Sequence, residues 1–294
     1  GLSYDTLFRM FKSSNEGRLE KMHLLLLWEG RLNRGRLIVL FDLSPTRASE
    51  WIREFGERFP ESMKWNSKTR SYEVLPGFFV STSKSRHDLS ESMAKYLAIV
   101  GLRNQEIEGV PHVALQAGFH DLSTPSPLVF SRLMEGIRTC QAVRIEYRSM
   151  QDPKPHSRDI APHSLVRSGR RWHVRAYSET HHAFRDYALG RISRIQLLER
   201  GDLPGVEDDD AWNTPVPVRL LPHPGLTRDQ QAVIRFEYFT DAASRVEICR
   251  GPMVPYFIQD VRAALLDSEQ PPQYQIIVAN LAEVKPWLWM PSKR

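Results

Sequence analysis

The sequence predicts an α+β protein built from several domains: an N-terminal winged helix-turn-helix, a small central β-barrel and a small C-terminal α+β unit. A length of 294 residues exceeds that of one typical domain. Apolar residues follow a helical period near the N-terminus, whereas short alternating strands begin after residue 141. An acidic run at 207–210 then marks a boundary before a last mixed segment.

The composition is that of a soluble globular protein, with 41% hydrophobic and 26% charged residues. No apolar stretch is as long as a membrane span and the N-terminus carries no signal peptide. We therefore expect a cytoplasmic protein with no membrane partner. The two cysteines, Cys140 and Cys249, form no disulfide framework and no Cys-x-x-Cys pair, which agrees with a reducing compartment.

The net charge of +5 is distributed unevenly along the chain. Residues 1–90 carry +4 and residues 130–200 carry +7, whereas residues 91–129 carry −2 and residues 201–294 carry −4. Two basic regions separated by an acidic connector are compatible with two different anionic partners. The acidic C-terminal region is a poor surface for DNA.

The N-terminal region has the element order of a winged helix-turn-helix. Residues 16–29 carry the apolar stripe of an amphipathic helix, and a short helix is expected over 35–41. Ser44 can cap a third helix that has Pro45 at its first position and ends at Pro60. Two short strands over 63–66 and 70–74, joined by a polar turn, complete the motif as a hairpin.

In such a motif the capped helix enters the major groove and the hairpin contacts phosphates. The helix buries Ala48, Trp51, Ile52 and Phe55 at helical spacing, which leaves a polar face. The residues predicted to contact double-stranded DNA are Ser44, Thr46, Arg47, Ser49 and Arg53 on the helix and Lys64, Asn66, Lys68 and Arg70 on the hairpin. The alternative is a three-helix bundle whose charged faces are merely solvated.

The middle of the chain contains a connector and a set of strands. A further helix is expected over 88–100, and the proline-containing segment 101–127 is interpreted as a connector. Ser126 caps another helix that leads into short strands separated by Gly, Pro and polar turns. These strands predict a small, strongly bent barrel.

The strand at 171–177 has two different faces. Its apolar face carries Trp172, Val174 and Ala176, and its polar face carries Arg171, His173, Arg175 and Tyr177. A row of guanidinium groups and aromatic rings suits an anionic or nucleotide-like ligand. A solvated strand face of a basic barrel is the alternative. A protonated His173 would hold an anion better, so affinity is expected to rise toward acidic pH.

The order of motifs in this region resembles the WYL domain of bacterial transcriptional regulators. The motifs are Tyr147, Arg158-x-Ile160-x-Pro162-x-x-Leu165, Trp172-x-x-x-Ala176-Tyr177, Phe184-Arg185 and Arg191-Ile192, within residues 130–200. The triplet that names the family is here Trp172-His173-Val174. The resemblance implies an SH3- or Sm-like barrel that senses a ligand. The candidate ligand-binding residues are Tyr147, His163, Trp172, His173, Arg175, Tyr177, Arg185 and Arg191.

The last part of the chain is expected to be a small α+β unit. Residues 233–239 and 246–249 alternate as strands, 256–266 suggests a helix, and 274–278 suggests a closing strand. The whole layout resembles the BrxR and CapW regulators of phage-defence systems, which implies that this extension forms a homodimer. The expected domains are 1–100 for DNA binding, 101–127 as connector, 128–202 for ligand sensing and 211–294 for dimerisation.

No catalytic motif is recognisable. The sequence contains no phosphate-binding glycine loop, no nucleophile elbow and no Cys/His set with zinc spacing, so we expect no enzyme, cofactor or metal. The acidic run 208–210 is interpreted as a solvated tail. The leading hypothesis is a dimeric repressor of a phage-defence operon that binds a palindromic or inverted-repeat operator and senses an anionic nucleotide or nucleic acid. The alternatives are an activator that senses single-stranded nucleic acid and, more distantly, a nucleotide-processing enzyme.

Overall fold

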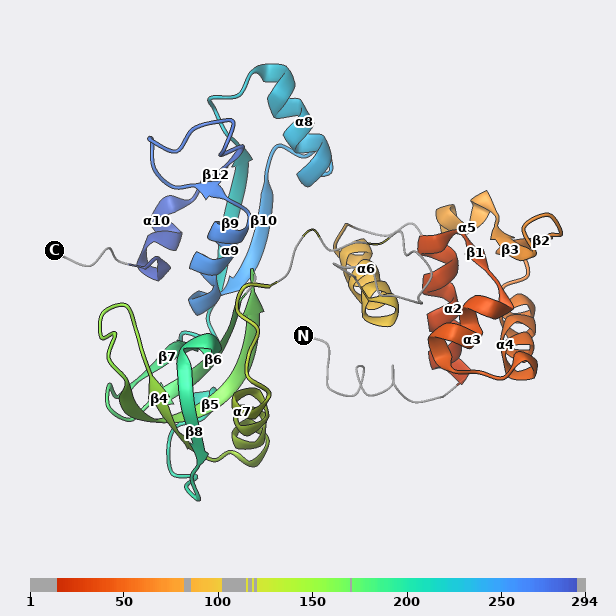
Figure 1. The fold of residues 1–294 in the computed structure, drawn as a ribbon. Helices are drawn as coiled ribbons and strands as arrows, with labels where there is room; N and C mark the ends of the chain where they lie inside the picture. The colour runs from red at the N-terminus through yellow and green to blue at the C-terminus, as the bar shows by residue number, and fades with distance from the viewer. Residues whose placement is uncertain are drawn as a thin grey trace. The chain divides into compact units, whose positions relative to one another are not determined.

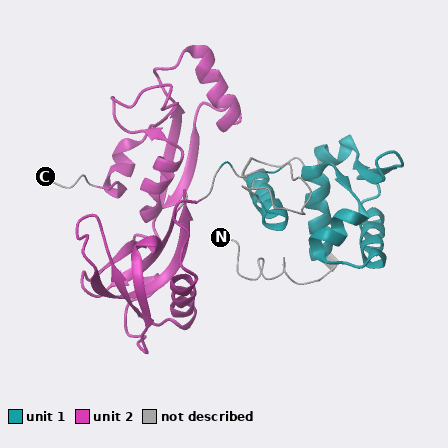
Figure 2. Ribbon diagram, viewed as in Figure 1, with its two compact units in different colours: residues 1–120 teal, residues 121–294 magenta. Residues whose placement is uncertain are grey.

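The computed structural model describes residues 15–81, 86–101, 115, 118, 121–169 and 171–289. The chain divides into two compact units, residues 1–120 and 121–294, and each is described by itself (Figure 2). Most of the predicted connector 101–127 lies outside the described residues. Within the described part of the chain, no helix is long and apolar enough to cross a bilayer.

The first unit is a helical bundle with a small three-stranded sheet (Figure 1). Its elements are α2 (Asn15–Glu29), β1 (Arg31–Leu32), α3 (Arg34–Phe41), α4 (Pro45–Arg58), β2 (Met63–Asn66), β3 (Ser71–Val74), α5 (Pro76–Ser81) and α6 (Arg86–Val100). The sheet order is β1-β3-β2, and all its strands are antiparallel. The predicted helices and hairpin are confirmed, whereas β1 and α5 were not predicted.

Local signals in the sequence explain these helices. The side chain of Asn33 accepts a hydrogen bond from Arg36 N at the start of α3, and Ser44 does the same for Arg47 N at the start of α4. Met22, Leu37 and Phe55 are fully buried in one core, so the apolar stripes of α2, α3 and α4 meet there. The opposite face of α4 remains exposed.

The second unit begins with the region that resembles a WYL domain. Its elements are α7 (Pro127–Thr139), β4 (Val143–Tyr147), β5 (His156–Ser168), β6 (Arg171–Ser178), β7 (Ala183–Ala188), the 3-10 turn η1 (Leu189–Arg191) and β8 (Ile192–Leu197). The strands form an antiparallel sheet in the order β7-β6-β5-β4-β8, and α7 packs against β5 and β8. Tyr147 alternates with Val143 and Ile145 on one face of β4 and is buried with them in its core.

A bulge interrupts the pairing of β5 with β6. Pro162 lies opposite Ala176 and Ser164 lies opposite Arg175, so His163 is an extra residue without a partner in the ladder. Such a bulge re-aims the side chain that it carries. The imidazole of His163 therefore leaves the regular alternation of the strand.

The C-terminal part of the same unit is a second, four-stranded sheet with helices. Its elements are the 3-10 turn η2 (Val206–Asp208), β9 (Pro215–Pro222), α8 (Arg228–Tyr238), β10 (Arg245–Arg250), η3 (Gly251–Met253), α9 (Val254–Asp260), β11 (Ala263–Ala264), β12 (Ile276–Val278), α10 (Leu281–Val284) and η4 (Lys285–Trp287). The strand order is β10-β9-β12-β11. Val218, Val254 and Val284 are fully buried in its core.

Two predictions about this part are wrong. Residues 233–239 lie in or directly after helix α8 and form no strand. Thr227 and Gln230 form a capping box at its start, a signal that the apolar alternation concealed. The helix predicted over 256–266 ends at Asp260, because Arg262 adopts a positive φ of 51° and the chain continues into β11.

Candidate functional site

The polar face of α4 presents the residues predicted to contact DNA. Thr46, Arg47, Ser49 and Arg53 are all exposed, while Ala48, Trp51, Ile52 and Phe55 hold the opposite face in the core. The hydrogen bond from Arg47 N to Ser44 Oγ fixes the first turn of the helix. This is the end that a recognition helix places against base edges.

Both arginines on this face are paired with glutamates of the same helix. Arg47 Nη1 lies 3.0 Å from Glu50 Oε2, and Arg53 Nη1 lies 2.9 Å from Glu57 Oε1. These pairs are exposed, and exposed pairs contribute only about 0–1 kcal/mol. Each guanidinium is therefore free to exchange its glutamate for a phosphate or a guanine edge.

The hairpin β2–β3 carries the predicted wing. Lys64, Lys68 and Arg70 are exposed, and Asn66 has a positioning role. The amide of Asn66 donates to Glu73 Oε1, and its Oδ1 accepts a hydrogen bond from Lys68 N, which shapes the turn. Sequence reasoning missed Trp65, whose side chain is 51% exposed on the wing and contacts Tyr72 edge to face.

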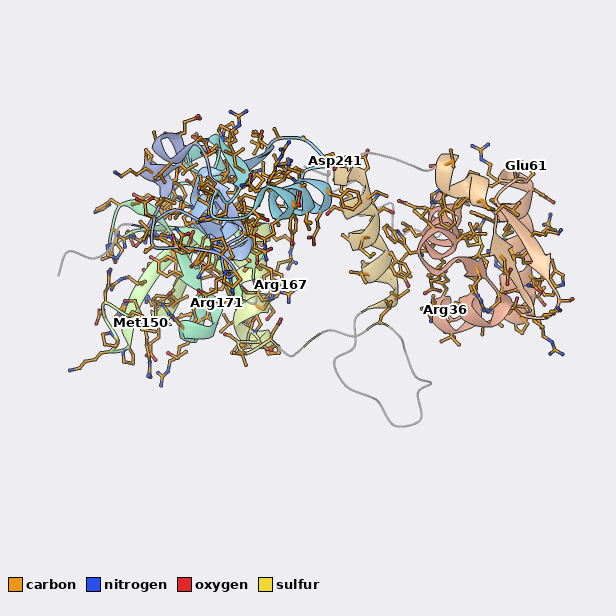
Figure 3. All side chains as sticks on the ribbon, turned by 90° about the horizontal axis from the view of Figure 1, so that it is seen from above. Arg36, Glu61, Met150, Arg167, Arg171 and Asp241 are labelled. Carbon is orange, nitrogen blue, oxygen red and sulfur yellow. The ribbon has the colours of Figure 1, made fainter. Side chains whose placement is uncertain are left out.

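A second candidate site is a cavity of about 500 Å³ between the WYL-like sheet and helix α9. Of the predicted ligand-binding residues, Tyr147, His173 and Arg191 line it. Arg171, from the polar face of the same predicted strand, lines it as well. The other lining residues were not predicted: Ser168, Gly169, Asp186, Ala188, Tyr256, Gln259, Asp260 and Trp289. Arg171, which is labelled in Figure 3, starts β6. It pairs with Ser168 at the end of β5.

The charged side chains that line this cavity differ in whether they are paired. Neither Arg171 nor Arg191 forms an ion pair within the described residues, whereas Asp186 has several partners. The hydroxyl of Tyr256 donates to Asp186 Oδ2 at 2.8 Å, and Arg175 Nη1 lies 3.3 Å from Asp186 Oδ1. The cavity therefore offers an anion two guanidinium groups that are not engaged in an ion pair, beside the carboxylates of Asp186 and Asp260.

His173 forms part of the wall of this cavity, where its ring packs against an aromatic side chain. Its ring stacks on Tyr256, with centroids 4.6 Å apart and an interplanar angle of 14°. Its Nε2 is buried without a hydrogen-bond partner and is 4.0 Å from Asp186 Oδ2. Burial lowers the pKa of His173 despite the nearby carboxylate, which keeps the ring neutral at neutral pH in the free protein. The predicted contribution of imidazolium to anion binding is thus confined to more acidic solutions.

We expect His173 to make the protein less stable in mild acid. The folded protein binds fewer protons at this ring than the unfolded chain, whose histidine titrates near pH 6.5, so unfolding becomes easier as pH falls below about 6.5. His173→Phe keeps an aromatic ring against Tyr256 and removes this titration. Urea unfolding between pH 5 and 7 should give a flatter pH dependence for the variant, and equal slopes would contradict the assignment.

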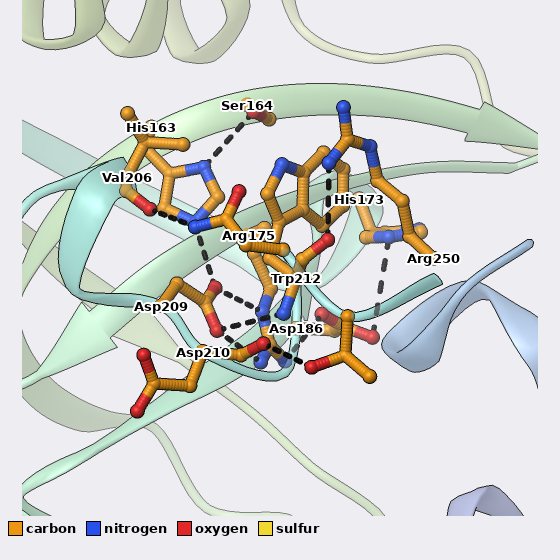
Figure 4. Close-up of polar contacts among 12 residues, drawn as sticks. His163, Ser164, His173, Arg175, Asp186, Val206, Asp209, Asp210, Trp212 and Arg250 are labelled. Atoms are coloured by element: carbon orange, nitrogen blue, oxygen red, sulfur yellow. Dashed lines mark hydrogen bonds and ion pairs between the residues drawn. The ribbon is translucent and has the colours of Figure 1, made fainter. Parts of the chain in front are cut away.

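A buried ionic cluster surrounds Arg175, which lies on the polar face of strand β6 (Figure 4). Asp209 Oδ2 accepts a hydrogen bond from Arg175 Nε at 2.9 Å and lies 2.8 Å from His163 Nε2, and its Oδ1 lies 3.1 Å from Arg175 Nη2. Asp209 has only 1% of its surface exposed. Burial alone would raise the pKa of Asp209, but the hydrogen bonds from Arg175 and His163 outweigh it and hold that pKa below its usual value.

Trp212 lies in the same segment as Asp209, between β8 and β9, and contacts residues of both neighbouring sheets. The guanidinium of Arg250, from β10, lies 4.8 Å from its ring centroid and donates to its carbonyl oxygen. On the other side, the ring of His163, from β5, contacts the ring of Trp212 edge to face, with centroids 5.3 Å apart. The segment around Asp209 and Trp212 therefore binds the WYL-like sheet to the C-terminal sheet.

This geometry corrects the interpretation of residues 208–210 as a solvated tail, and it gives Arg175 and His173 structural contacts that the strand pattern does not show. Arg175 is not free of a core role, because its guanidinium is buried between two carboxylates. Asp209 is not part of a solvated tail. His173 has aromatic company in Tyr256. Sequence reasoning missed the cluster because its members are 34 and 46 residues apart in the chain.

The remaining candidate ligand residues lie outside the cavity lining. His163 and Arg175 belong to the buried cluster, and Trp172 contacts Phe130 edge to face. Tyr177 contacts Phe184, while Arg185 is exposed on β7. Their part in ligand binding stays a prediction. Among the described residues, no group of three or more His, Cys, Asp or Glu side chains is arranged to hold a metal ion.

Comparison with protein families assigns a family model to each part of the chain. A model of the BrxR transcriptional regulator winged helix-turn-helix domain matches residues 14–100. The WYL domain model matches residues 128–197, and a model of the BrxR transcriptional regulator C-terminal dimerization domain matches residues 215–284. The predicted fold class, with these three parts in this order, is confirmed.

Curated proteins similar over nearly the whole chain are DNA-binding transcriptional repressors called CapW. The protein from Stenotrophomonas maltophilia is 29% identical over 277 residues, which is 92% of this chain and 91% of that protein. The protein from Pseudomonas aeruginosa is 29% identical over 92% of this chain and 90% of its own length. The one from Escherichia coli strain KTE188 is 30% identical over 92% of this chain and 90% of its own length.

Proposed function

Because the chain belongs to the family of the CapW repressors and BrxR regulators, we propose that it is a homodimeric, DNA-binding transcriptional repressor. The observation that carries the proposal is the polar face of α4, on which every helix residue predicted to contact DNA is exposed beside a basic wing. We further propose that residues 1–100 bind the operator, 128–202 sense a ligand and 211–294 dimerise, with 101–127 as connector.

The mode of DNA binding follows from the two basic elements of the first unit. Arg47 and Thr46 lie in the first turn of α4, where a recognition helix contacts bases. Lys64, Lys68 and Arg70 extend from the hairpin, where they would neutralise phosphates without reading sequence. Because a homodimer presents two such helices, we expect a palindromic or inverted-repeat operator.

The ligand of the middle domain is proposed to be an anionic nucleotide or nucleic-acid fragment. Arg171 and Arg191 supply guanidinium groups that have no carboxylate partner within the described residues, and a cavity of about 500 Å³ is of the size of small-molecule sites. We propose that the regulated operon serves phage defence, on the basis of the family alone. An activator that senses single-stranded nucleic acid would use the same cavity and remains the second candidate.

The test of operator binding is a pair of substitutions on the two elements. Arg47→Ala should weaken operator binding by about 1–3 kcal/mol and relax specificity at one base pair, because a bidentate base contact is lost. Lys68→Ala should weaken all duplexes alike and lower the salt dependence by about one counterion, because only a phosphate contact is lost. Fluorescence anisotropy over a salt series measures both.

A matched control comes from the other end of the same helix. Arg58 is exposed in the last turn of α4, away from the turn that contacts bases, so Arg58→Ala should keep the sequence preference of the wild type. If Arg47→Ala and Lys68→Ala both bind operator like wild type, the winged-helix assignment fails. Replacing the operator by its single strands in the same titration tests the activator hypothesis.

A further inference from the structure

The cavity beside His173 is lined by two domains. Tyr147, Arg171 and Arg191 come from the WYL domain, whereas Tyr256, Gln259 and Asp260 come from α9 of the C-terminal domain, with Trp289 from its last described residues. Helix α9 also packs against β5. Any molecule that fills this cavity must therefore contact the C-terminal domain as well as the domain that holds the guanidinium groups.

Tyr256 connects the two sides of the cavity through three contacts, which involve His173, Asp186 and Trp289. Its ring stacks on His173, its hydroxyl donates to Asp186 at 2.8 Å, and its ring and that of Trp289 are perpendicular with centroids 4.8 Å apart. Burial and the carboxylate of Asp186 raise the pKa of Tyr256, so the hydroxyl keeps its proton and remains a donor. The hydroxyl of Tyr256 is thus a defined hydrogen-bonded link from α9 to β7.

Asp186 joins this link to the rest of the C-terminal domain. Its Oδ2 accepts from Tyr256, and its Oδ1 lies 3.3 Å from Arg175, which in turn holds Asp209 of the segment before β9. An anion entering the cavity beside Arg171 and Arg191 changes the electrostatic environment of Asp186. The contacts of Asp186 lead from there toward the C-terminal domain, through Tyr256 on one side and through Arg175 and Asp209 on the other.

We propose that the ligand site is shared between the two domains, and that Tyr256 is the positioning residue through which the C-terminal domain senses whether the site is occupied. This inference rests on the proposed function, because it needs an operator affinity to report on. A ligand changes that affinity only if it binds the two states of the protein unequally. Asp186 and Asp260 favour a ligand that carries hydrogen-bond donors besides its anion, as a nucleotide does and a bare phosphate does not.

The experiment uses the full-length protein, its operator duplex, and thymidine 5′-monophosphate and inorganic phosphate as probes. Probe affinity is measured by calorimetry, and operator affinity by anisotropy with and without saturating probe. In the wild type we expect the nucleotide to bind more tightly than phosphate and to change the operator affinity at least about fivefold. Arg191→Ala should abolish probe binding, which places the probe in the cavity.

Tyr256→Phe removes only the hydroxyl and is the decisive variant. It should bind the nucleotide within about threefold of wild type, because the stacked ring remains, while the effect of the nucleotide on operator affinity falls below about twofold. Tyr274→Phe is the matched control, because Tyr274 bonds to Glu269 within the C-terminal domain and does not line this cavity. It should keep the wild-type response. Asp186→Asn provides a second way to weaken the same link if Tyr256→Phe folds poorly.

The outcomes separate the inference from the function on which it rests. An unchanged response in both Tyr256→Phe and Asp186→Asn overturns the inference and leaves the repressor intact. Operator binding by the wild type with no binding of either probe overturns the anionic ligand and the shared site together. Absence of operator binding overturns the proposed function and this inference with it.

Discussion

Arg175→Ala should lower the free energy of unfolding by about 3–5 kcal/mol, because it leaves the carboxylate of Asp209 buried without its main partner. Arg175 is 8% exposed, and its guanidinium bonds to both oxygens of Asp209. Loss of a buried charge partner costs more than loss of an exposed one, since water cannot take its place. Equilibrium unfolding in urea measures the effect.

Two further variants identify the cause. Arg185 is exposed on the neighbouring strand β7. The variant Arg185→Ala should therefore change the free energy of unfolding by less than about 0.5 kcal/mol. Combining Arg175→Ala with Asp209→Asn should restore part of the loss, because the buried charge is removed. If Arg175→Ala alone costs less than about 1 kcal/mol, the cluster does not hold the segment.

Phe236→Asp should convert the homodimer into a monomer at micromolar concentration and weaken operator binding with it. The side chain of Phe236 is 70% exposed on α8, and Ile248 is 63% exposed on β10, an edge strand of the sheet. Val233 on α8 and Val246 on β10 are exposed as well, and this domain matches a dimerization domain, so these side chains are the candidates for the contact between two copies. Burying a phenylalanine contributes about 1.5–3 kcal/mol per protomer, and a carboxylate in its place adds a desolvation cost.

The control for this prediction is another exposed apolar residue of the same unit. Met150 is 81% exposed in the turn between β4 and β5, labelled in Figure 3, and belongs to the WYL domain. Met150→Asp should leave the protein dimeric by light scattering. A dimer that persists in Phe236→Asp and in Ile248→Asp would show that copies meet elsewhere.

Local signals made the first unit predictable from sequence. Ser44 caps α4 and Pro45 begins it, and apolar spacing assigns the buried face without any knowledge of tertiary contacts. The C-terminal unit was harder, because α8 buries Ile234 and leaves Val233 and Phe236 exposed. Apolar residues on both faces of a helix imitate the alternation of a strand.

The candidate site was predictable only in part, because one wall comes from a distant segment. His173 and Arg191 follow from the strand pattern and the family resemblance, whereas Tyr256 is 70 residues from Asp186 and carries no local mark of its contact. The burial of Arg175 against Asp209 could not be predicted from the sequence either. An alternating strand shows which residues share a face, but it does not show what covers that face.

The segment around Asp209, residues 203–214, determines where two related chains can be recombined. The WYL match ends at residue 197 and the dimerization match begins at residue 215, so the segment that joins the two sheets belongs to neither. A chimera cut at residue 202 would place the imidazole of His163 and the guanidinium of Arg175 opposite a foreign sequence. A cut after residue 214 transfers their partner with them. Recombination between relatives is thus expected to be better tolerated where residues 203–214 travel with the WYL sheet, because the buried charges stay paired, although the contact of Trp212 with Arg250 then crosses the cut.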